Sequence, residues 1–277
     1  MSSPSCLASR ARLARRFRLR FFASITLAAL AALSIAAVAC GTGPSPAPAV
    51  PTGLVLVDPP APSADTGAPS PPAVAVHHAA EELDPGLATK KAPETFSAHF
   101  VTTKGDFVIE VHRAWAPNGA DRFYNLVSLG FYDDTRFFRS IAGFMVQFGI
   151  PAEPAVASKW VEAHIQDDPP KQSNRRGFVT FAQTGMPNSR TTQIFINYGD
   201  NSQLDAANFT PFGRVVTGMN VVDSLYSEYG EGAPNGNGPA QGRIQTEGNT
   251  YLDQDFPKLD RILSVTLMMP VPTRKAP

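Results

Sequence analysis

The sequence is poor in cysteine and has no excess of charge of either sign. Its 277 residues contain two cysteines, Cys6 and Cys40, and 24 basic residues balance 24 acidic ones, giving a formal net charge of +0. A protein that binds the phosphates of nucleic acid shows a basic excess, so we expect no nucleic-acid partner. Because two cysteines cannot build a disulfide framework, we expect a domain stabilised by its hydrophobic core.

Motifs of the common catalytic classes are also missing. The chain has no GxSxG nucleophile motif, no Walker GK[ST] phosphate loop and no HExxH zinc motif. Three histidines follow residue 94, at His99, His112 and His164, but they are far apart and share no metal-ligand spacing. We therefore expect no metal and no cofactor.

Three other polar segments have simpler interpretations than catalysis. Asp167-Asp168 could act as an acid–base pair, but Pro169-Pro170 follow at once, which favours a solvated turn. The glycine-rich segment 230–242 lacks the Lys-Ser/Thr pair of a phosphate site, so we interpret it as a long loop. His77-His78 lack the further ligands of a metal site, and we expect them to be solvated.

The first 39 residues have the pattern of an export signal. Six arginines from Arg10 to Arg20 precede an uncharged apolar run from Phe21 to Ala39, which is the order of the basic and apolar parts of such a signal. A permanent membrane anchor is the alternative, because the run is close to the length of about 20 residues that spans a bilayer. Its many alanines and the small residues before Cys40 favour a cleaved signal.

The segment AAVAC, at Ala36–Cys40, resembles the lipobox of bacterial lipoproteins. In that family the cysteine receives a diacylglyceryl group, and the signal is cut just before it. The resemblance implies that Cys40 is the lipid attachment site and that the chain is exported and anchored to a membrane of the cell envelope. Cys6 would leave with the signal, so no intrachain disulfide and no other free thiol would remain.

Composition divides the rest of the chain into a tether, a domain and a short tail. Residues 40–93 are rich in Pro, Ala, Ser and Gly and show no lasting apolar period. We expect a disordered or partly polyproline tether there, with a reach of about 40 Å. Residues 94–270 show strand and helix patterns and form the domain, and residues 271–277 form the tail.

Strand patterns outnumber helix patterns in the domain. Alternating apolar residues predict eight strands, at 96–101, 106–112, 136–141, 144–149, 178–182, 193–198, 211–216 and 261–268. Helical spacing predicts two helices, at 117–130 with Asn118 as the cap and at 217–230. Without regular βαβ alternation, these elements predict a mainly β fold, an eight-stranded antiparallel closed barrel with two packed helices. A closed barrel has no exposed edge, which suits a monomer.

The segment RFFRSIAGFMVQFG, residues 136–149, places two polar residues in an apolar stretch. If Ala142-Gly143 turns a hairpin, Arg139 and Gln147 lie close across it. Arg139 keeps its proton and cannot be a general acid, but it can donate hydrogen bonds, and Gln147 can donate and accept them. Such a pair against an apolar wall suits a neutral ligand with an apolar ring and a carbonyl. Taken alone, an arginine is more often a surface residue, and its apolar neighbours are more often core.

Three blocks of sequence, in order, resemble the cyclophilin-type peptidyl-prolyl cis-trans isomerases in their bacterial form. FFRSIAGFMVQFG is similar to the family signature, in which Phe-His-Arg and Gly-Phe-Met-x-Gln-Gly recur. Residues 176–197 and 204–225 resemble the next two blocks, and the helical segment 120–137 fits as well. The likeness covers residues 96–268. It implies the same barrel with two helices, isomerase activity on X-Pro bonds, proline-containing polypeptides as partners, and no cofactor.

The resemblance also implies roles for nine residues. Arg139 matches the catalytic arginine, and Gln147 accompanies it. The residues that match the proline pocket are Phe144, Met145, Gln147, Phe195 and Leu204, and those that match the neighbouring backbone groove are Ala182, Gln183 and Gln193.

Several positions depart from the family pattern. Phe138 replaces the usual His, Ala142 replaces Pro, and Phe148 and Ile150 alter the Gly-Gly-Asp after the glutamine. The segment 151–175 replaces a glycine-rich loop, so we expect a remodelled rim of the groove. Gln203 stands where many members have a Trp that contacts cyclosporin, and we expect weak cyclosporin binding. The family's pocket His falls at Asn208 or Phe209.

Two alternatives to an enzyme remain open. One is a non-catalytic module of the same fold that binds proline-containing segments or acts as a chaperone. The other is a structural envelope lipoprotein whose barrel only presents a surface. The retained set of Arg139, Phe144, Met145, Gln147 and Phe195 argues against both.

Overall fold

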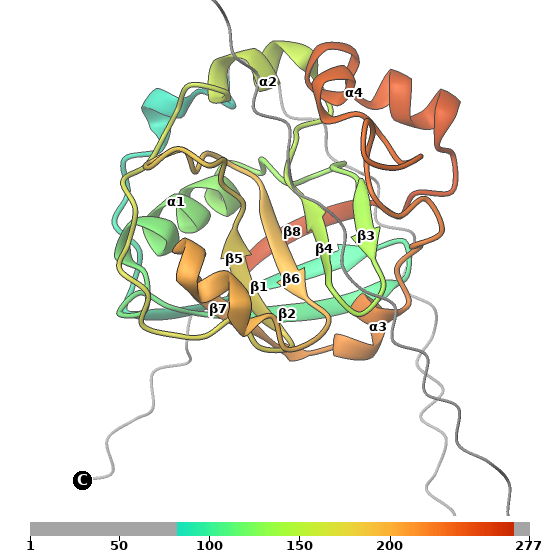
Figure 1. Cartoon of the computed structure of the whole chain (residues 1–277). Coiled ribbons are helices and arrows are strands. Elements are labelled where there is room, and N and C mark those ends of the chain that lie inside the picture. The colour runs from blue at the N-terminus through green and yellow to red at the C-terminus, as the bar shows by residue number, and fades with distance from the viewer. Residues whose placement is uncertain (1–81, 269–277) are drawn as a thin grey trace, which may run out of the picture. The chain divides into compact units, whose positions relative to one another are not determined.

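The computed structural model describes residues 82–268, and eight strands in this part form one sheet (Figure 1). The strands are β1 (Thr95–Thr102), β2 (Gly105–His112), β3 (Arg139–Ile141), β4 (Met145–Phe148), β5 (Phe178–Phe181), β6 (Ile194–Asn197), β7 (Pro211–Thr217) and β8 (Ile262–Met268). Their order is β3-β4-β6-β5-β7-β2-β1-β8, and all neighbours are antiparallel. All eight predicted strands are therefore confirmed.

The sheet curls into a half-barrel, and the closed barrel expected from the sequence is not confirmed. β3 and β8 are the two end strands of the sheet. Irregular backbone bridges the space between them: the N–H of Asp134 donates to the carbonyl of Ile262 at 2.9 Å, and the N–H of Phe137 donates to that of Asp260 at 3.0 Å. Closure by strand pairing fails because β3 has three residues and is preceded by turns.

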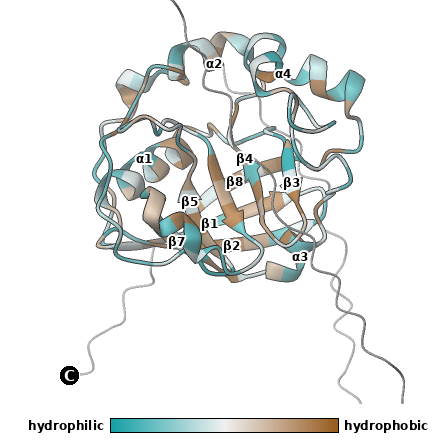
Figure 2. Ribbon diagram, in the orientation of Figure 1, coloured by the Kyte–Doolittle hydropathy of each residue, from teal (hydrophilic) through white to brown (hydrophobic). Residues whose placement is uncertain are grey.

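Side chains from the inner face of the sheet and from α1 (Pro117–Ser128) form the main core. On β1, Phe96, Ala98 and Phe100 are fully buried, and the residues between them are partly exposed. Phe100 stacks on Phe107 of β2 with ring centroids 4.7 Å apart, and Phe123 of α1 lies 6.3 Å from Phe100. Burial of each ring contributes about 1.5–3 kcal/mol. Figure 2 shows the hydrophobic residues along the strands and hydrophilic ones on the outer helices.

The start of α1 differs from the prediction in its cap. The N-cap is Ala116, whose side chain makes no capping hydrogen bond, and the predicted cap Asn118 lies inside the helix, just after Pro117. Instead, the carboxylate of Asp168 accepts hydrogen bonds from the N–H groups of Asn118 and Gly119, each at 2.9 Å. A tertiary contact therefore satisfies helix N–H groups that a local side chain usually caps.

The second predicted helix is shorter than expected, because α3 spans only Met219–Asp223. After it, the N–H of Tyr226 donates to the carboxylate of Asp260 at 2.8 Å. The ring of Tyr229 packs edge-on against Phe256 with centroids 5.0 Å apart. Tyr226 and Tyr229 therefore contact the segment 256–260 instead of continuing the helix, and Leu225 packs in the main core.

Two helices that the sequence pattern did not predict, α2 (Pro154–Trp160) and α4 (Gln241–Asp255), pack together (Figure 1). α4 is kinked at Gly248, where φ is 63°, and the N–H of Asn249 donates to the carbonyl of Ala152 at 3.0 Å. A Cβ at position 248 would collide with the same carbonyl, so only glycine permits this approach. The sequence pattern did not reveal these two helices, because α2 is short and the kink interrupts the apolar period of α4.

The described part begins with a segment that the sequence assigned to the tether. The indole N–H of Trp160 donates to the carbonyl of Leu83 at 2.8 Å. The side chain of Asn125 on α1 bonds both the N–H and the carbonyl of Lys90, at 2.9 and 2.6 Å. Leu83 and Ala92 are buried, so the packed region extends to residue 83 instead of beginning at 94. Two buried positions show no periodicity, which is why composition alone did not reveal them.

Candidate active site

The hairpin of β3 and β4 brings Arg139 opposite Gln147, as predicted. The two residues are register partners, and the N–H of Phe144 donates to the carbonyl of Ile141 at 3.0 Å to close the turn at Ala142-Gly143. Arg139 Nη1 donates to Gln147 Oε1 at 3.0 Å, and its guanidinium carbon lies 6.0 Å from the centroid of the Phe144 ring. The polar pair and the apolar wall therefore form one site.

β6 extends this row of side chains. Gln147 is the register partner of Phe195, and its Nε2 donates to Oε1 of Gln193 at 2.8 Å. The carbonyl of Gln193 accepts a hydrogen bond from the N–H of Ala182 at 2.9 Å. A hydrogen-bonded chain thus runs from Arg139 through Gln147 to Gln193 and fixes the orientation of both amides.

The alternation of β4 and β6 places the site on the outer face of the sheet. Val146 and Phe148 belong to the main core, so Met145 and Gln147 point to the opposite face. Phe195 points to this face as well, because it pairs with Gln147. Met145 and Phe195 are 1% and 4% exposed, yet neither belongs to the main core. Their burial comes from the walls of a separate cleft.

A cleft of about 650 Å³ lies over this outer face. All nine residues assigned to the proline pocket and groove line it, namely Arg139, Phe144, Met145, Gln147, Ala182, Gln183, Gln193, Phe195 and Leu204. Phe209 also lines the cleft and packs edge-on against Phe195, with centroids 5.8 Å apart. The structure therefore brings together every residue that the sequence assigned to this site.

Glu231 also lines the cleft, and sequence reasoning missed it. Its Oε1 accepts from Arg139 Nε at 2.6 Å, and its Oε2 accepts from Arg139 Nη2 at 2.7 Å. These hydrogen bonds from Arg139 lower the pKa of Glu231, and one from the N–H of Gly232 adds to the effect. Glu231 lies in the glycine-rich segment interpreted as a loop, and no local pattern connects that loop to Arg139.

Two of the departures from the family pattern, Phe138 and Ile150, hold α4 beside the cleft. The buried members of this second hydrophobic cluster are Phe138, Ile150, Ile244, Tyr251 and Leu252. Phe138, which is 1% exposed, directly precedes Arg139 in the chain. Because the cluster fixes α4, Gln241 and Gln245 from this helix line the cleft. The rim of the cleft is therefore built from α4 as well as from residues 151–175.

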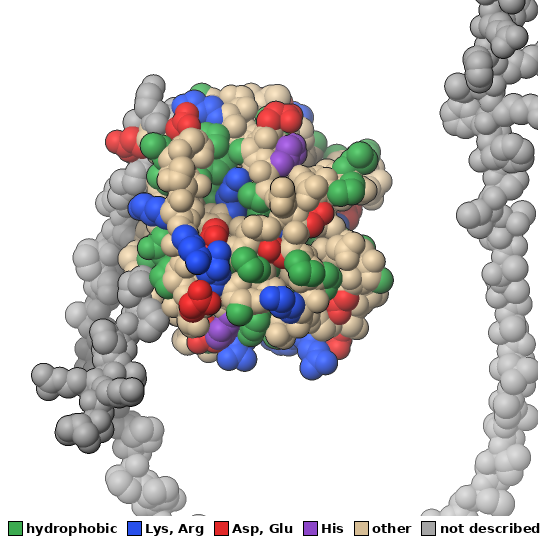
Figure 3. All heavy atoms as spheres, turned by 90° about the vertical axis from the view of Figure 1, so that its left-hand side faces the viewer, with side chains coloured by type: hydrophobic (Ala, Val, Ile, Leu, Met, Phe, Trp, Pro, Cys, Tyr) green, Lys and Arg blue, Asp and Glu red, His purple; other side chains and the backbone are tan. Residues whose placement is uncertain are grey.

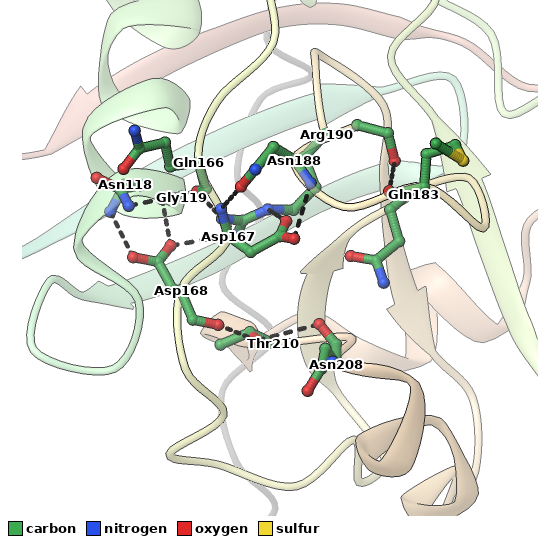
Figure 4. Close-up of polar contacts among 12 residues, drawn as sticks. Asn118, Gly119, Gln166, Asp167, Asp168, Gln183, Asn188, Arg190, Asn208 and Thr210 are labelled. Carbon is green, nitrogen blue, oxygen red and sulfur yellow. Dashed lines mark hydrogen bonds and ion pairs between the residues drawn. The ribbon is translucent and has the colours of Figure 1, made fainter.

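A second arginine, Arg190, lies in a buried polar network near the cleft rim (Figure 4). Its Nη1 lies 3.2 Å from the carboxylate of Asp168, the group that caps α1. Asp167 and Asn188 exchange two hydrogen bonds of 2.8 Å between side chain and backbone. Asp168 is 4% exposed, so the predicted solvated turn is wrong for this residue. The positive end of α1 and the guanidinium together compensate its burial.

The network around Arg190 also fixes part of the cleft rim. Its guanidinium donates to the carbonyl of Gln166 and pairs with Asp167, which joins two loops. Thr184 and Ser189, from the loop that ends at Arg190, line the cleft. The two aspartates are engaged by Arg190 and by backbone N–H groups, and they are structural residues here.

Another part of the cleft rim comes from the 3-10 helix η2 (Ser202–Ala207). Leu204 lines the cleft, whereas Gln203 is exposed and lies outside the lining. Gln183 Nε2 donates to the carbonyl of Ala207 at 2.7 Å. Its buried Oε1 has no hydrogen-bond partner among the described residues, which makes it a candidate acceptor for an N–H of a bound peptide.

Three further observations concern surface charge, metal ligands and apolar helices between residues 82 and 268. On the face shown in Figure 3, basic and acidic side chains are interspersed, so this face has no continuous basic patch for nucleic acid. Within the same range, no three His, Cys, Asp or Glu residues cluster as metal ligands, and no helix is long and apolar enough to cross a bilayer. The predicted signal, Cys40, the tether up to residue 81 and the tail lie outside the described residues.

Known proteins with similar sequences point to one family. A family model described as cyclophilin type peptidyl-prolyl cis-trans isomerase/CLD matches residues 97–246. The peptidyl-prolyl cis-trans isomerase B of Escherichia coli (strain K12) is 34% identical over 177 residues, which are 61% of this chain and 97% of that protein. A peptidyl-prolyl cis-trans isomerase of Acinetobacter baylyi is 37% identical over 129 residues, 45% of this chain and 68% of that protein.

Among solved structures, the cyclophilin type isomerase of Cryptosporidium parvum covers 64% of this chain and 99% of its own length, at 21% identity and a TM-score of 0.48. The family model spans more than half of the chain and includes both Arg139 and Gln147. The E. coli relative is covered over nearly its whole length. By the family model and the E. coli relative, the chain belongs to the cyclophilin-type peptidyl-prolyl cis-trans isomerase family.

Proposed function

We propose that this protein accelerates the cis–trans interconversion of X-Pro bonds in polypeptides, with Arg139 as the catalytic donor and no covalent intermediate. One observation carries the proposal. A guanidinium and an amide are hydrogen-bonded to each other across β3 and β4, and the same cleft offers the apolar side chains of Phe144, Met145 and Phe195. This combination fits a proline ring and its flanking carbonyls.

The chemistry requires a donor that acts only in the transition state. A planar X-Pro bond rotates slowly because amide resonance sets a barrier of about 18–20 kcal/mol. When the bond twists, the proline nitrogen becomes pyramidal and regains a lone pair. Arg139 donates a hydrogen bond to that lone pair, which the planar ground state does not offer. Such differential binding accelerates the step.

The contacts of Arg139 leave donors for this task. Glu231 and Gln147 occupy three of the five N–H groups of a guanidinium. Nη1 also donates to the sulfur of Met145 at 3.8 Å, and a thioether sulfur is only a weak acceptor. N–H groups on Nη1 and Nη2 therefore remain for a group bound in the cleft.

One hydrogen bond does not supply the whole effect. An acceleration of about 10⁵ requires about 7 kcal/mol, and a charge-assisted hydrogen bond contributes about 1.5–3 kcal/mol. The remainder comes from holding the proline ring against Met145 and Phe195 while Gln147, Gln193 and the groove fix the backbone. Exclusion of water strengthens each of these interactions.

Exchange NMR on an X-Pro peptide tests the proposal directly. Catalysis produces exchange cross-peaks between the cis and trans forms at substoichiometric protein. A non-catalytic module that binds proline segments would instead shift the peptide resonances without exchange. A purely structural barrel would leave the peptide spectrum unchanged. Either of the last two results contradicts the enzyme.

We also propose that the protein works outside the cytoplasm on exported or envelope proteins, attached to a membrane by a lipid on Cys40. The support is sequence alone, namely the basic segment, the apolar run and AAVAC. Mass spectrometry of the mature N-terminus tests it: a diacylglyceryl group on Cys40 is expected, and Cys40→Ala should prevent both lipidation and cleavage. An intact segment 1–39 in the unaltered protein would establish a permanent anchor instead.

A further inference from the structure

Glu231 is 92 residues from Arg139 in sequence and contacts it with both carboxylate oxygens. This is a side-on pair, in which Nε and Nη2 donate in parallel. Such bidentate pairs fix the plane of the guanidinium as well as its distance. An arginine side chain has many rotamers, and Glu231 together with Gln147 restricts it to one.

The loop that carries Glu231 is itself constrained. The N–H of Gly238 donates to the carbonyl of Glu231 at 2.8 Å, and the N–H of Gly232 donates to its Oε1 at 2.9 Å. A Cβ at Gly236 would collide with the carbonyl of Glu231, so the loop requires glycine there. The glycine-rich composition thus serves to wind the backbone around one carboxylate.

α4 connects this loop to the position next to Arg139. The N–H of Ala240 donates to the hydroxyl of Tyr251 at 3.1 Å, and Tyr251 belongs to the second hydrophobic cluster with Phe138. Phe138 immediately precedes Arg139. The segment from Glu231 to the end of α4 therefore packs against Phe138 and holds the side chain of Arg139.

We propose that Glu231 is a positioning residue, which holds the Arg139 guanidinium in the orientation that receives the twisted proline nitrogen. The proposal rests on the isomerase function proposed above. It predicts an effect on turnover more than on binding, because the side-chain hydrogen bonds of Glu231 go to Arg139 and Gly232. The apolar wall proposed to hold the proline ring consists of other residues, Phe144, Met145 and Phe195. The pair uses the Nε edge and leaves N–H groups on Nη1 and Nη2, so the carboxylate does not block the donor.

The test compares Glu231→Ala, Glu231→Asp and Glu231→Gln with Glu228→Gln as the matched control. Glu228 is exposed, lies three residues away and bonds the hydroxyl of Tyr226, so its replacement removes the same charge outside the cleft. We expect Glu231→Ala to lower kcat about tenfold, equivalent to about 1.4 kcal/mol, with KM nearly unchanged. Glu231→Gln, which keeps one acceptor, should retain more activity than Glu231→Ala, and Glu231→Asp, which is too short, should not.

Nitrogen-15 NMR of the Arg139 Nε–H gives a second readout that does not need activity. We expect this signal to be protected in the unaltered protein and in Glu228→Gln, and to exchange rapidly with water in Glu231→Ala. Unchanged kcat with an unchanged signal, or a higher kcat in Glu231→Ala, would overturn the positioning role while leaving the isomerase intact. If the unaltered protein lacks isomerase activity, the proposed isomerase function is contradicted. The proposed role of Glu231 in catalysis is then contradicted too, whatever the NMR signal shows.

Discussion

Arg139 and Arg190 are both paired with carboxylates, yet their surroundings differ in one decisive respect. Arg190 is 1% exposed and its partners Asp167, Asp168 and Gln166 belong to loops that it joins. The side chain of Arg139 is 22% exposed, stands on the wall of a cleft, and keeps N–H groups that its partners do not use. A fully enclosed guanidinium stabilises structure, whereas one that opens into a cleft is available to a ligand.

The largest effect is expected where the enclosed pair is broken. Asp168→Ala leaves Arg190 buried with its charge poorly compensated and removes the cap of α1, so the free energy of unfolding should fall by about 3–5 kcal/mol. Urea denaturation measures it. Asp223→Ala is the control, because its pair with Arg176 is exposed and should cost at most about 1 kcal/mol. An equal fall in the free energy of unfolding in the two variants would show that enclosed and exposed ion pairs contribute alike.

Arg139→Ala should have the opposite profile. We expect kcat/KM for an X-Pro peptide to fall about 100-fold, equivalent to about 2.7 kcal/mol, because the donor to the proline nitrogen is lost. Stability should change by no more than about 1 kcal/mol, since the side chain is partly exposed. Exchange NMR and urea denaturation on the same sample give both numbers. Undiminished turnover would remove Arg139 from the mechanism.

The same substitution, made once in the second hydrophobic cluster and once in the main core, distinguishes the roles of the two clusters. Ile244→Val and Ile109→Val both trim a buried isoleucine and should each cost about 0.5–1.5 kcal/mol of stability. Only Ile244→Val loosens α4 and the loop of Glu231, so only it should lower kcat, by less than about threefold, equivalent to less than 0.7 kcal/mol. A drop of the same size in Ile109→Val would show that general destabilisation is the cause.

The smallest effect concerns pH. Hydrogen bonds from Arg139 lower the pKa of Glu231 in the folded state, so this pair adds stability above the ordinary glutamate range and loses it as pH falls through the lowered folded pKa. The gain is small because Glu231 is partly exposed and screened by solvent. The other titratable residues lining the cleft, Glu162 and His164, follow α2, and α4 contributes only glutamines. Between pH 7 and pH 3, the free energy of unfolding should therefore fall slightly less in Glu231→Gln than in the unaltered protein. An identical fall would show that the pair with Arg139 does not contribute to stability.

Sequence patterns predicted the catalytic cleft better than its surroundings. The hairpin that pairs Arg139 with Gln147 was predictable because both strands and their turn lie within ten residues, from 139 to 148. The turn fixes the register between the two strands. The resemblance added Phe195 and Leu204, and the structure places both in the lining. Phe138 and Ile150 were recognised as departures from the family pattern. Only the structure shows that both pack against α4, a helix that no sustained apolar period predicted.

The sequence by itself determined the eight strands, their inward and outward faces and the Arg139–Gln147 pair, because strand alternation and a tight turn are local properties of the chain. Tertiary structure alone decided that the sheet stops at a half-barrel, that Asp168 caps a helix 50 residues away, and that Glu231 reaches Arg139 across 92 residues. Those outcomes depend on where loops pack. The sequence around a carboxylate in a loop does not indicate which distant cation the carboxylate will pair with.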